Sequence, residues 1–382
     1  MEKDFYLSFS LSPIGPKRFK KLLEIFGSGE KAWKRAEDDF KKAGVGEKVF
    51  AKFDLFRKKL DCKQYLEKLK KTKVEIIAQF EKEYPKKLLE LSDAPIVLFA
   101  KGNKNLLFAE NIIGVVGTRK ITSYGKQVTE DLVSSLSSAG FIIASGMALG
   151  VDGIAHKTAI DCQVKWQGYP LPNLPKGSTI AVLGCGVDCP YPRENQNLYE
   201  EILDSGGLII SEYPLGMLAN KGTFPARNRI IAGISLAVLV TEAGKDSGSL
   251  ITASNAASQG RTVFAVPGPI TSRMSDGTSK LLKEGAVLVS SAEDILESLN
   301  IKNIPTNFIR AGSRMKTIIG TFKKFKISRE ERKILGAIEY EGLTIDEISR
   351  MTKIPIGKLS IILSEMELKG LVKNSGGKFS SI

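Results

Sequence analysis

The chain has 382 residues, 42% of them hydrophobic and 26% charged, which is enough for two or three globular domains with sizeable cores. Its formal net charge of +14 is uneven: residues 1–90 carry +8, residues 91–300 carry −2 and residues 301–382 carry +8. Basic flanks around a near-neutral middle favour a polyanionic partner such as nucleic acid, although a lysine-rich solvated surface explains them equally well. The acidic N-terminus has no long apolar stretch, and segment 230–240 is too short to span a bilayer, so we expect neither a secretory signal nor a membrane protein.

Residues 1 to about 80 carry helical patterns only, and they predict a small helical N-terminal domain. Segment Pro16–Phe26 places Phe19, Leu22, Leu23 and Phe26 at helical spacing, directly after a Pro-Ile-Gly-Pro turn.

The next region, residues 81–300, alternates short apolar runs with helical patterns. Seven runs are rich in Val, Ile and Leu with little alternation, as in strands buried on both faces. They are Ile112–Gly117, Phe141–Gly146, Thr179–Gly184, Leu208–Tyr213, Ala237–Ala243, Val263–Gly268 and Ala286–Ser290. Between them lie helical candidates at Tyr124–Ser138, Asn195–Asp204 and Gly248–Ser258. This order predicts an α/β fold, a Rossmann-like parallel sheet with helices on both faces.

The C-terminal part begins with residues 301–328, which contain Pro305, Gly312 and Gly320 and basic but no acidic residues, so we interpret them as a basic linker. Residues 329–382 then show three helical patterns and a short β-type ending, Leu371–Phe379. Three helices followed by a hairpin predict a winged-helix domain.

The first strand of the sheet ends in Gly117-Thr118-Arg119, just before a helix with Thr122 or Ser123 as its cap. Backbone N–H groups and a helix N-terminus meet at this point of a Rossmann-type sheet, so we expect an anion site there. The glycine pattern is not that of a dinucleotide fingerprint, and Gly244-Lys245 lacks the Ser or Thr of a P-loop. Neither NAD nor ATP is therefore expected, and no cofactor is predicted.

The densest chemical cluster of the near-neutral region is the run from Lys221 to Arg229, which includes Phe224, Arg227 and Asn228. Cations that follow phosphates and a ring that lies under a base are the mixture that holds single strands. The alternative places Phe224 in the core and the arginines in surface ion pairs.

The second strand ends in Ser145-Gly146, without an acidic residue at the position that binds a ribose. Small residues at which a ligand backbone can approach closely follow the fifth strand, at Ser247-Gly248 in segment Glu242–Ser249, where a helix begins. A tight strand-to-helix turn would require the same glycines, so both interpretations stay open.

Residues that could hold a metal or act in catalysis are sparse. Cys185 and Cys189 form one close pair, but no second pair and no nearby His completes a zinc site. Four cysteines in so long a chain fit a reducing compartment, and a cytoplasmic location is expected. His156 is the only histidine, and we expect it to be a hydrogen-bonded structural residue rather than a general base.

Six motifs in order closely resemble the bacterial DNA-processing protein A family, also called DprA or Smf. They are GTR at 117–119, SGMALGVDGIAH at 145–156, YP at 191–192, FPARNRIIAG at 224–233, EAGKDSGSLITA at 242–253 and VPG at 266–268. The resemblance covers residues 84–300 well. It implies that residues 1–80 are that family's small helical N-terminal domain, of the SAM or helix-hairpin-helix-like kind, and that residues 329–382 are its winged-helix domain. Segment 164–177 departs from the pattern, because it is longer than the usual turn before the third strand.

The resemblance implies a homodimeric protein that binds single-stranded DNA during natural transformation and assists the loading of the recombinase RecA. The same resemblance gives Arg119, Lys221 and Phe224 as DNA-binding residues, with Arg227 and Arg229 in the same motif. The strand-end residues Gly117, Ser145, Gly146, Ser247 and Gly248 complete the expected DNA-binding set. We expect no intrinsic enzymatic turnover.

Two alternatives belong to other classes of protein. A related Rossmann-like family hydrolyses nucleotide N-glycosidic bonds at the same strand ends, but segment Glu242–Ser249 lacks that family's Pro-Gly-Gly and trailing Glu. A transcription factor acting through the winged helix is the weaker alternative. Assay of nucleotide hydrolysis separates the enzyme from the DNA-binding protein.

Overall fold

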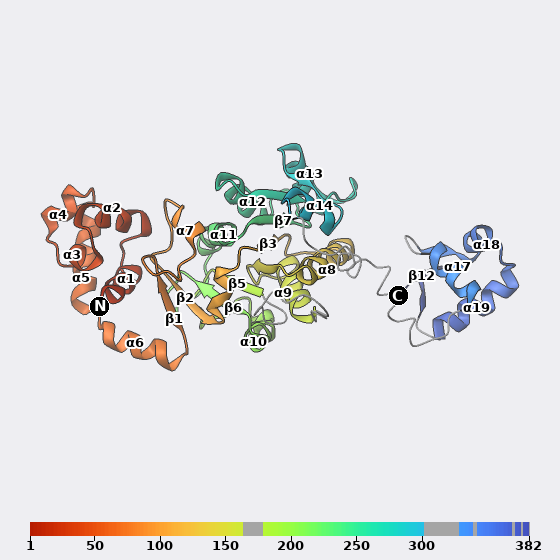
Figure 1. The fold of residues 1–382 in the computed structure, drawn as a ribbon, viewed down its shortest axis with the longest axis horizontal. Helices are drawn as coiled ribbons and strands as arrows, with labels where there is room; N and C mark the ends of the chain where they lie inside the picture. The colour runs from red at the N-terminus through yellow and green to blue at the C-terminus, as the bar shows by residue number, and fades with distance from the viewer. Residues whose placement is uncertain (163–178, 302–327, 339–341, 369–370, 376, 382) are drawn as a thin grey trace. The chain divides into compact units, whose positions relative to one another are not determined.

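The computed structural model describes residues 1–162, 179–301, 328–338, 342–368, 371–375 and 377–381. The chain divides into two compact units, residues 1–313 and 314–382 (Figure 1). Segment 164–177 and nearly all of the predicted basic linker at 301–328 lie outside the described residues.

Among the described residues, nine strands form the sheet of the first unit, in the order β1-β2-β6-β5-β4-β3-β7-β8-β9. Their bounds are β1 Glu75–Ala78, β2 Val97–Gly102, β3 Ile112–Val116, β4 Ile142–Ser145, β5 Thr179–Leu183, β6 Leu208–Ser211, β7 Ala237–Val240, β8 Thr262–Ala265 and β9 Val287–Leu288. Strands β3 to β9 pair in parallel, and the predicted parallel sheet and all seven of its predicted strands are confirmed.

Strands β1 and β2 extend this sheet in antiparallel pairing beyond β6. The expectation that residues 1 to about 80 hold helices alone is therefore wrong at β1, and β2 was not predicted either. Strand β1 has only four residues, Glu-Ile-Ile-Ala, and follows directly on a lysine-rich helix. So short an apolar run carries no distinct strand periodicity.

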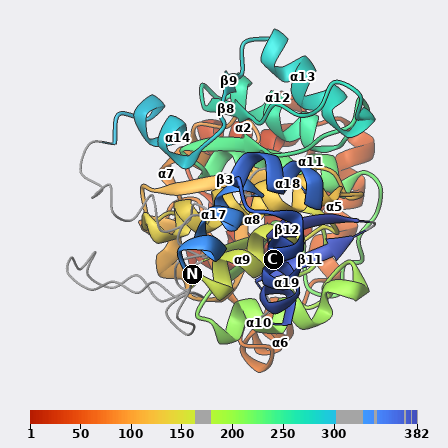
Figure 2. The same cartoon turned by 90° about the vertical axis from the view of Figure 1, so that its right-hand side faces the viewer.

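Helices cover both faces of the sheet because successive strand residues point to opposite sides. Ile113 and Val115 of β3 pack against α8, α9 and α14, whereas the neighbouring Ile112 and Val116 face the side of α11, α12 and α13. In Figure 2, α12 and α13 lie above β3, and α9 and α10 lie below it. The helices are α8 Ser123–Ser138, α9 Val151–Asp161, α10 Gln196–Asp204, α11 Thr223–Ile234, α12 Ser249–Ser258, α13 Asp276–Lys283 and α14 Ala292–Ser298, with short 3-10 turns η1 Lys104–Phe108, η2 Arg193–Asn195 and η3 Arg273–Ser275. The three helices predicted in this region match α8, α10 and α12 to within one residue.

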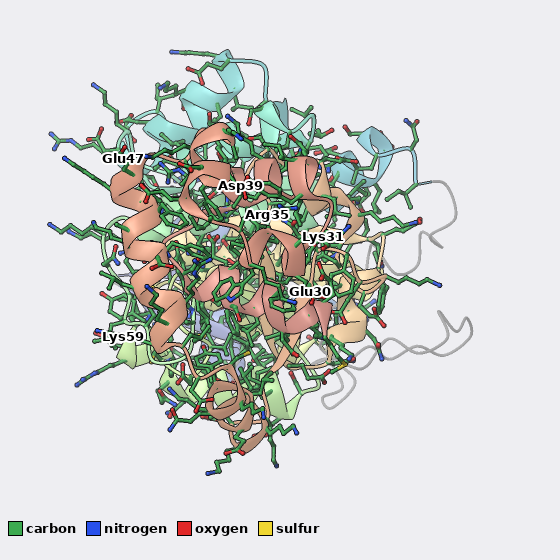
Figure 3. All side chains as sticks on the ribbon, turned by 90° about the vertical axis from the view of Figure 1, so that its left-hand side faces the viewer. Glu30, Lys31, Arg35, Asp39, Glu47 and Lys59 are labelled. Atoms are coloured by element: carbon green, nitrogen blue, oxygen red, sulfur yellow. The ribbon has the colours of Figure 1, made fainter. Side chains whose placement is uncertain are left out.

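The N-terminal helices pack around an aromatic cluster that includes Phe9, Phe19, Phe40 and Phe53, and this core continues into residues of β2, β5 and β6. Helix α2 has the predicted bounds, and Gly27 ends it with a positive φ of 80° that L residues rarely adopt. The helices are α1 Glu2–Leu11, α2 Pro16–Phe26, α3 Gly29–Trp33, α4 Glu37–Lys42, α5 Glu47–Lys59, α6 Cys62–Lys71 and, after β1, α7 Lys86–Leu89. Figure 3 views the molecule from this end.

The second unit is the predicted winged helix. Helices α17 Arg329–Ala337, α18 Ile345–Thr352 and α19 Ile356–Leu368 bury an apolar core of their own, and strands β10 Leu343–Thr344, β11 Val372–Ser375 and β12 Lys378–Ser381 form its sheet. Capping boxes fix the start of α17, between Ser328 and Glu331, and the start of α18, between Thr344 and Glu347. Three helices followed by a hairpin are confirmed.

Within the described part of the chain, no helix combines the length and the apolar character that crossing a membrane requires.

Candidate nucleic-acid interface

The candidate interface lies at the carboxyl ends of the parallel strands. The chain leaves β3 toward β4 on one side and returns to β3 through β7 on the other, so the strand order reverses between β3 and β7. Open α/β sheets form their binding crevice at such a point. A cavity of about 1010 Å³ is found here, lined by residues that follow β3, β7 and β8 and by the start of α11.

Lys221 and Phe224 are presented by the loop between β6 and α11. The Asn220 side chain accepts the N–H groups of Gly222 and Thr223, and the Thr223 hydroxyl donates back to the Asn220 carbonyl. These bonds fix the turn into α11, so that exposed Lys221 and half-buried Phe224 both line the cavity.

Phe224 lies between two partners in the cavity. The Arg119 guanidinium carbon is 5.1 Å from the centre of its ring, and the Tyr191 ring centre is 5.5 Å away at an angle of 38°. Arg119 and Tyr191 are both exposed. The site thus joins an exposed guanidinium to two neighbouring rings, a pair of surfaces that suits a phosphate and an unpaired base. Tyr191 was not predicted as a site residue, although the Tyr-Pro motif that contains it was noted.

Arg227 is buried beneath this surface rather than facing solvent. Its guanidinium donates to the carbonyl of Gly146 at 2.8 Å and to the carbonyl of Val182, and its Nε donates to the Asn228 side chain. Gly146 leaves the necessary room, because a Cβ there would lie 2.3 Å from an Arg227 nitrogen. Arg227 therefore ties α11 to the ends of β4 and β5 and forms the floor of the cavity.

Asp152 of α9 also lines the cavity, and His156 of the same helix is fully buried. The Asp152 carboxylate accepts the N–H groups of Gly146 and Ala148 at 3.1 and 3.4 Å, and burial raises its pKa above the usual range. His156 Nδ1 lies 2.7 Å from the Thr179 hydroxyl, and burial lowers the pKa of the imidazole to about 3. His156 is neutral at physiological pH, and its prediction as a hydrogen-bonded structural residue is confirmed.

Arg229 lies away from the cavity. It donates two hydrogen bonds to the Glu212 carboxylate, at 2.8 and 2.7 Å, and pairs with Asp93 at 3.1 Å. The alternative of an ion-paired arginine thus describes Arg229, and the structure does not bring it together with Arg119, Lys221 and Phe224.

The remaining predicted residues lie in and under the cavity. Ser247 and Gly248 line it, at the turn before α12. Ser145 is fully buried and donates to the Val115 carbonyl at 2.6 Å. A Cβ on Gly117 would lie 2.5 Å from Val151 and 2.7 Å from the Glu242 carbonyl, so this position requires glycine for packing.

Glu242, which follows β7, was not predicted to position the site. Its carboxylate accepts the Thr122 N–H at 2.9 Å and the Thr122 hydroxyl at 2.5 Å, and its carbonyl accepts the Thr118 N–H at 2.7 Å. The loop that carries Arg119 is thus fastened to the end of β7. A carboxylate directly after a strand and a threonine at a helix cap were the signals available in the sequence.

These bonds also correct the expected anion site at α8. The N–H of Thr122 bonds Glu242, and the N–H of Gly125 bonds the Thr122 hydroxyl. Two donors at this helix N-terminus are therefore occupied from within the protein, next to a carboxylate. The Arg119 side chain is therefore the group expected to contact an anion at this place.

Three further cations line the cavity and were not predicted as site residues. Lys120 follows β3, Lys245 follows β7, and Arg273 stands in η3 after β8; all three are exposed. Asp246 and Asp276 lie among them. The cationic groups thus form a band across the ends of three strands, which extends the pattern of a phosphate-following surface.

No group of three or more His, Cys, Asp or Glu side chains within the described residues is arranged to hold a metal ion. The Cys185 thiol donates to the Cys189 carbonyl at 3.0 Å, and burial raises the pKa of Cys185 to about 11. This thiol is therefore protonated at neutral pH.

The chain is similar to known protein families and to individual proteins of those families. Residues 75–300 match the family described as DNA recombination-mediator protein A, and residues 325–378 match the DprA winged helix domain. Protein Smf of Synechocystis is 33% identical over 98% of both chains, and DNA processing protein DprA of Bacillus subtilis is 42% identical over 58% of this chain and 70% of its own.

Two solved structures are also similar. DNA processing protein A (DprA) of Streptococcus pneumoniae has a TM-score of 0.66 and 34% identity, covering 77% of this chain and 97% of its own. DNA processing protein A of Helicobacter pylori, whose structure concerns its single-stranded DNA binding mode, has a TM-score of 0.51 and 32% identity, covering 59% and 95%.

Proposed function

Since this chain belongs to the DNA recombination-mediator protein A family, also called DprA or Smf, we propose that it binds single-stranded DNA in the cavity at the ends of β3 and β7. The arrangement of Phe224 between Arg119 and Tyr191, beside exposed Lys221, is the observation that carries this proposal. A relative from Helicobacter pylori, described by its single-stranded DNA binding mode, supports it.

The chemistry of the two ligand parts explains a preference for single strands. Arg119 and Lys221 would neutralise neighbouring phosphates, while the rings of Phe224 and Tyr191 would stack on an unpaired base. A duplex offers its phosphates but keeps its bases stacked, so it would have to pay an unstacking cost to reach the rings.

Photo-crosslinking tests this placement. A single strand that carries one 5-iodouracil should crosslink to Phe224 or Tyr191, because excitation joins the base to a stacked ring. Crosslinks confined to the winged-helix domain, residues 329–382, would contradict the proposed site.

We also propose that the chain has no turnover of its own. Three carboxylates near the cavity are occupied: Glu242 by Thr122, Glu212 by Arg229, and Asp152 by two backbone N–H groups in a buried position. Asp246 and Asp276 also line the cavity, but both are exposed to solvent among the cations Lys120, Lys245 and Arg273. A general base needs an accessible lone pair within reach of its proton. Release of free base from a nucleoside monophosphate that disappears in Glu242→Gln would favour the hydrolase instead.

Family membership supports two finer proposals, namely that the protein acts as a homodimer and that it assists the loading of a RecA-type recombinase during DNA uptake. Recombinase assembly on single strands should be faster with the wild type than with Phe224→Ala at equal concentration. Equal rates would separate DNA binding from recombinase loading and contradict the second proposal. Sedimentation of the free protein measures its oligomeric state and so tests the homodimer.

A further inference from the structure

The cations of the N-terminal helical region are not used by the cavity. Segment 57–73, which covers the end of α5 and all of α6, contains eight Lys or Arg residues and two acids. On α6, Leu69 is buried and Tyr65 and Leu66 are half-buried, so the helix packs along one stripe and turns its lysines to solvent. In Figure 3, Lys59, at the end of α5, marks the edge of this region.

Few of these cations are neutralised by a partner. Arg57 and Lys58 share the Asp54 carboxylate, with contacts of 2.6 Å each. Asp61 accepts the Gln64 N–H as the cap of α6. In the part of the chain that the structure describes, no ion pair is found for the other six lysines of the segment, which are Lys59, Lys63, Lys68, Lys70, Lys71 and Lys73.

A cleft of about 560 Å³ lies between α5 and α6. Phe56, Leu60 and Tyr65 give it apolar and aromatic walls, and three unpaired lysines, Lys59, Lys68 and Lys71, stand along it; Asp61, Gln64 and Glu67 complete the lining. Rings and aliphatic groups beside cations form the same mixture as in the cavity, which suits bases and phosphates of a single strand.

The cleft lies against the loops that build the cavity. The Tyr65 hydroxyl accepts the Leu215 N–H at 2.9 Å, in the loop that leads from β6 to Lys221. The Lys68 ammonium stands beside Gly216, at 3.7 Å from where a Cβ would be. The Gly216 N–H in turn bonds Asp188 at 2.8 Å, in the loop that leads to Tyr191. These three contacts connect the α5–α6 cleft with both loops that carry aromatic and cationic groups of the cavity.

We propose that the α5–α6 cleft is a second binding segment for single-stranded DNA, which receives the strand where it leaves the cavity past Lys221. This inference rests on the proposed function and extends it, because it assigns the basic N-terminal flank to the same strand. Continuity with the cavity favours DNA over an acidic protein partner, since a separate protein would not require the connection through Tyr65 and Lys68.

Strand length separates the two segments experimentally. The test compares the wild type with the triple variant Lys59→Ala/Lys68→Ala/Lys71→Ala on strands of about 6 and about 20 nucleotides. The variant should bind the short strand like the wild type. On the long strand its log–log salt slope should be flatter by about 2, because each lost phosphate contact removes about 0.7.

Two controls make the result specific. Lys17→Ala/Lys20→Ala/Lys21→Ala removes the same charge from exposed positions of α2, which lies at the opposite end of the helical region from α6 in Figure 1, and it should leave both strands unaffected. Lys59→Arg/Lys68→Arg/Lys71→Arg should retain long-strand binding, and melting curves should match the wild type for all three variants.

The outcomes are distinct. A triple variant that binds the long strand like the wild type, and instead loses an acidic protein partner, overturns the second segment. Equal losses on both lengths overturn it as well, because the lysines would then act on the cavity. If the wild type binds neither length, the proposed function itself fails.

Discussion

At the residue scale, the three arginines that were predicted to bind DNA have three different surroundings. Arg119 is exposed and packs against the ring of Phe224. Arg227 donates to buried carbonyls, and Arg229 pairs with Glu212 and Asp93. Two residues apart on a helix, Arg227 and Arg229 point about 200° apart, so only one of them can face the sheet ends. These surroundings give the three side chains different expected roles, in DNA binding, in stability and in a local ion pair.

Replacing Phe224 by Ala should weaken single-strand binding by about 1–3 kcal/mol through the loss of base stacking. Because Phe224 is half-buried at the cavity, the melting temperature should change little. The salt dependence of binding should also stay nearly unchanged, since no phosphate contact is removed. A titration beside a melting curve measures both, and a large drop in melting temperature would assign Phe224 to the core instead.

Arg119→Ala and Arg227→Ala should separate binding from stability. Arg119→Ala should fold like the wild type and flatten the salt slope by about 0.7. Arg227→Ala should lower the free energy of unfolding by about 3 kcal/mol or more, because it leaves two buried carbonyls and the buried Asp152 without their cation. Urea unfolding checks this, and equal stability of the two variants would contradict the assigned roles.

His156 predicts a pH dependence of stability. The unfolded chain protonates this residue near pH 6.5, whereas the folded protein keeps it neutral down to about pH 3. As pH falls below 6.5 the unfolded state binds the extra proton, so stability falls by up to about 1.4 kcal/mol per pH unit and does not change above that range. His156→Gln should lack this component between pH 6.5 and 4. The same pH profile in both proteins would exclude His156 as its source.

At the scale of elements, the parallel strands were predictable because burial on both faces produces continuous apolar runs such as Ile112–Val116. The carboxyl ends of parallel strands lie at the same edge of a sheet, so Arg119 and Gly248 could be predicted to lie close together. Both line the cavity. Strand β1 was not predictable in this way, because a four-residue edge strand has too few positions to show a period.

The details of the site depend on contacts between elements that are far apart in sequence. Glu242 bonds Thr122 across 120 residues, and Arg227 bonds Gly146 across 81 residues. Neither contact leaves a periodic or compositional signal. The sequence therefore indicated the position of the cavity and its exposed groups, but not which cations would be buried or paired.

Helix α19 of the winged helix should not read a DNA sequence. Leu359, Leu363 and Met366 are buried in the core, and exposed Lys358 pairs with Glu330 at 2.5 Å. No Arg, Asn or Gln stands in Ile356–Leu368, so the bidentate base contacts worth about 1–3 kcal/mol each are absent. Footprinting of segment 325–382 on mixed duplexes should show no preferred site, and one protected sequence would contradict this.

At the scale of the whole molecule, we expect the cavity around Phe224 and the basic flanks to contribute differently to DNA binding. The middle region carries −2, yet it places exposed cations around Phe224, while the flanks carry +8 each. In the near-neutral region, stacking on the Phe224 ring should distinguish single strands from duplexes. The basic flanks should attract the phosphates of both forms of DNA. Preference for single strands should therefore depend on the cavity, and total affinity on the cavity and the flanks together.

The most direct measurement of the central claim is a titration of the wild type and Phe224→Ala with one sequence as a single strand and as a duplex, each at two salt concentrations. The wild type should prefer the single strand at both concentrations, because stacking is less sensitive to salt than phosphate contacts. Phe224→Ala should lose affinity for the single strand and leave duplex binding nearly unchanged, so that the preference narrows. Equal binding of both forms by the wild type, or equal losses on both forms in the variant, would contradict a stacking site at Phe224.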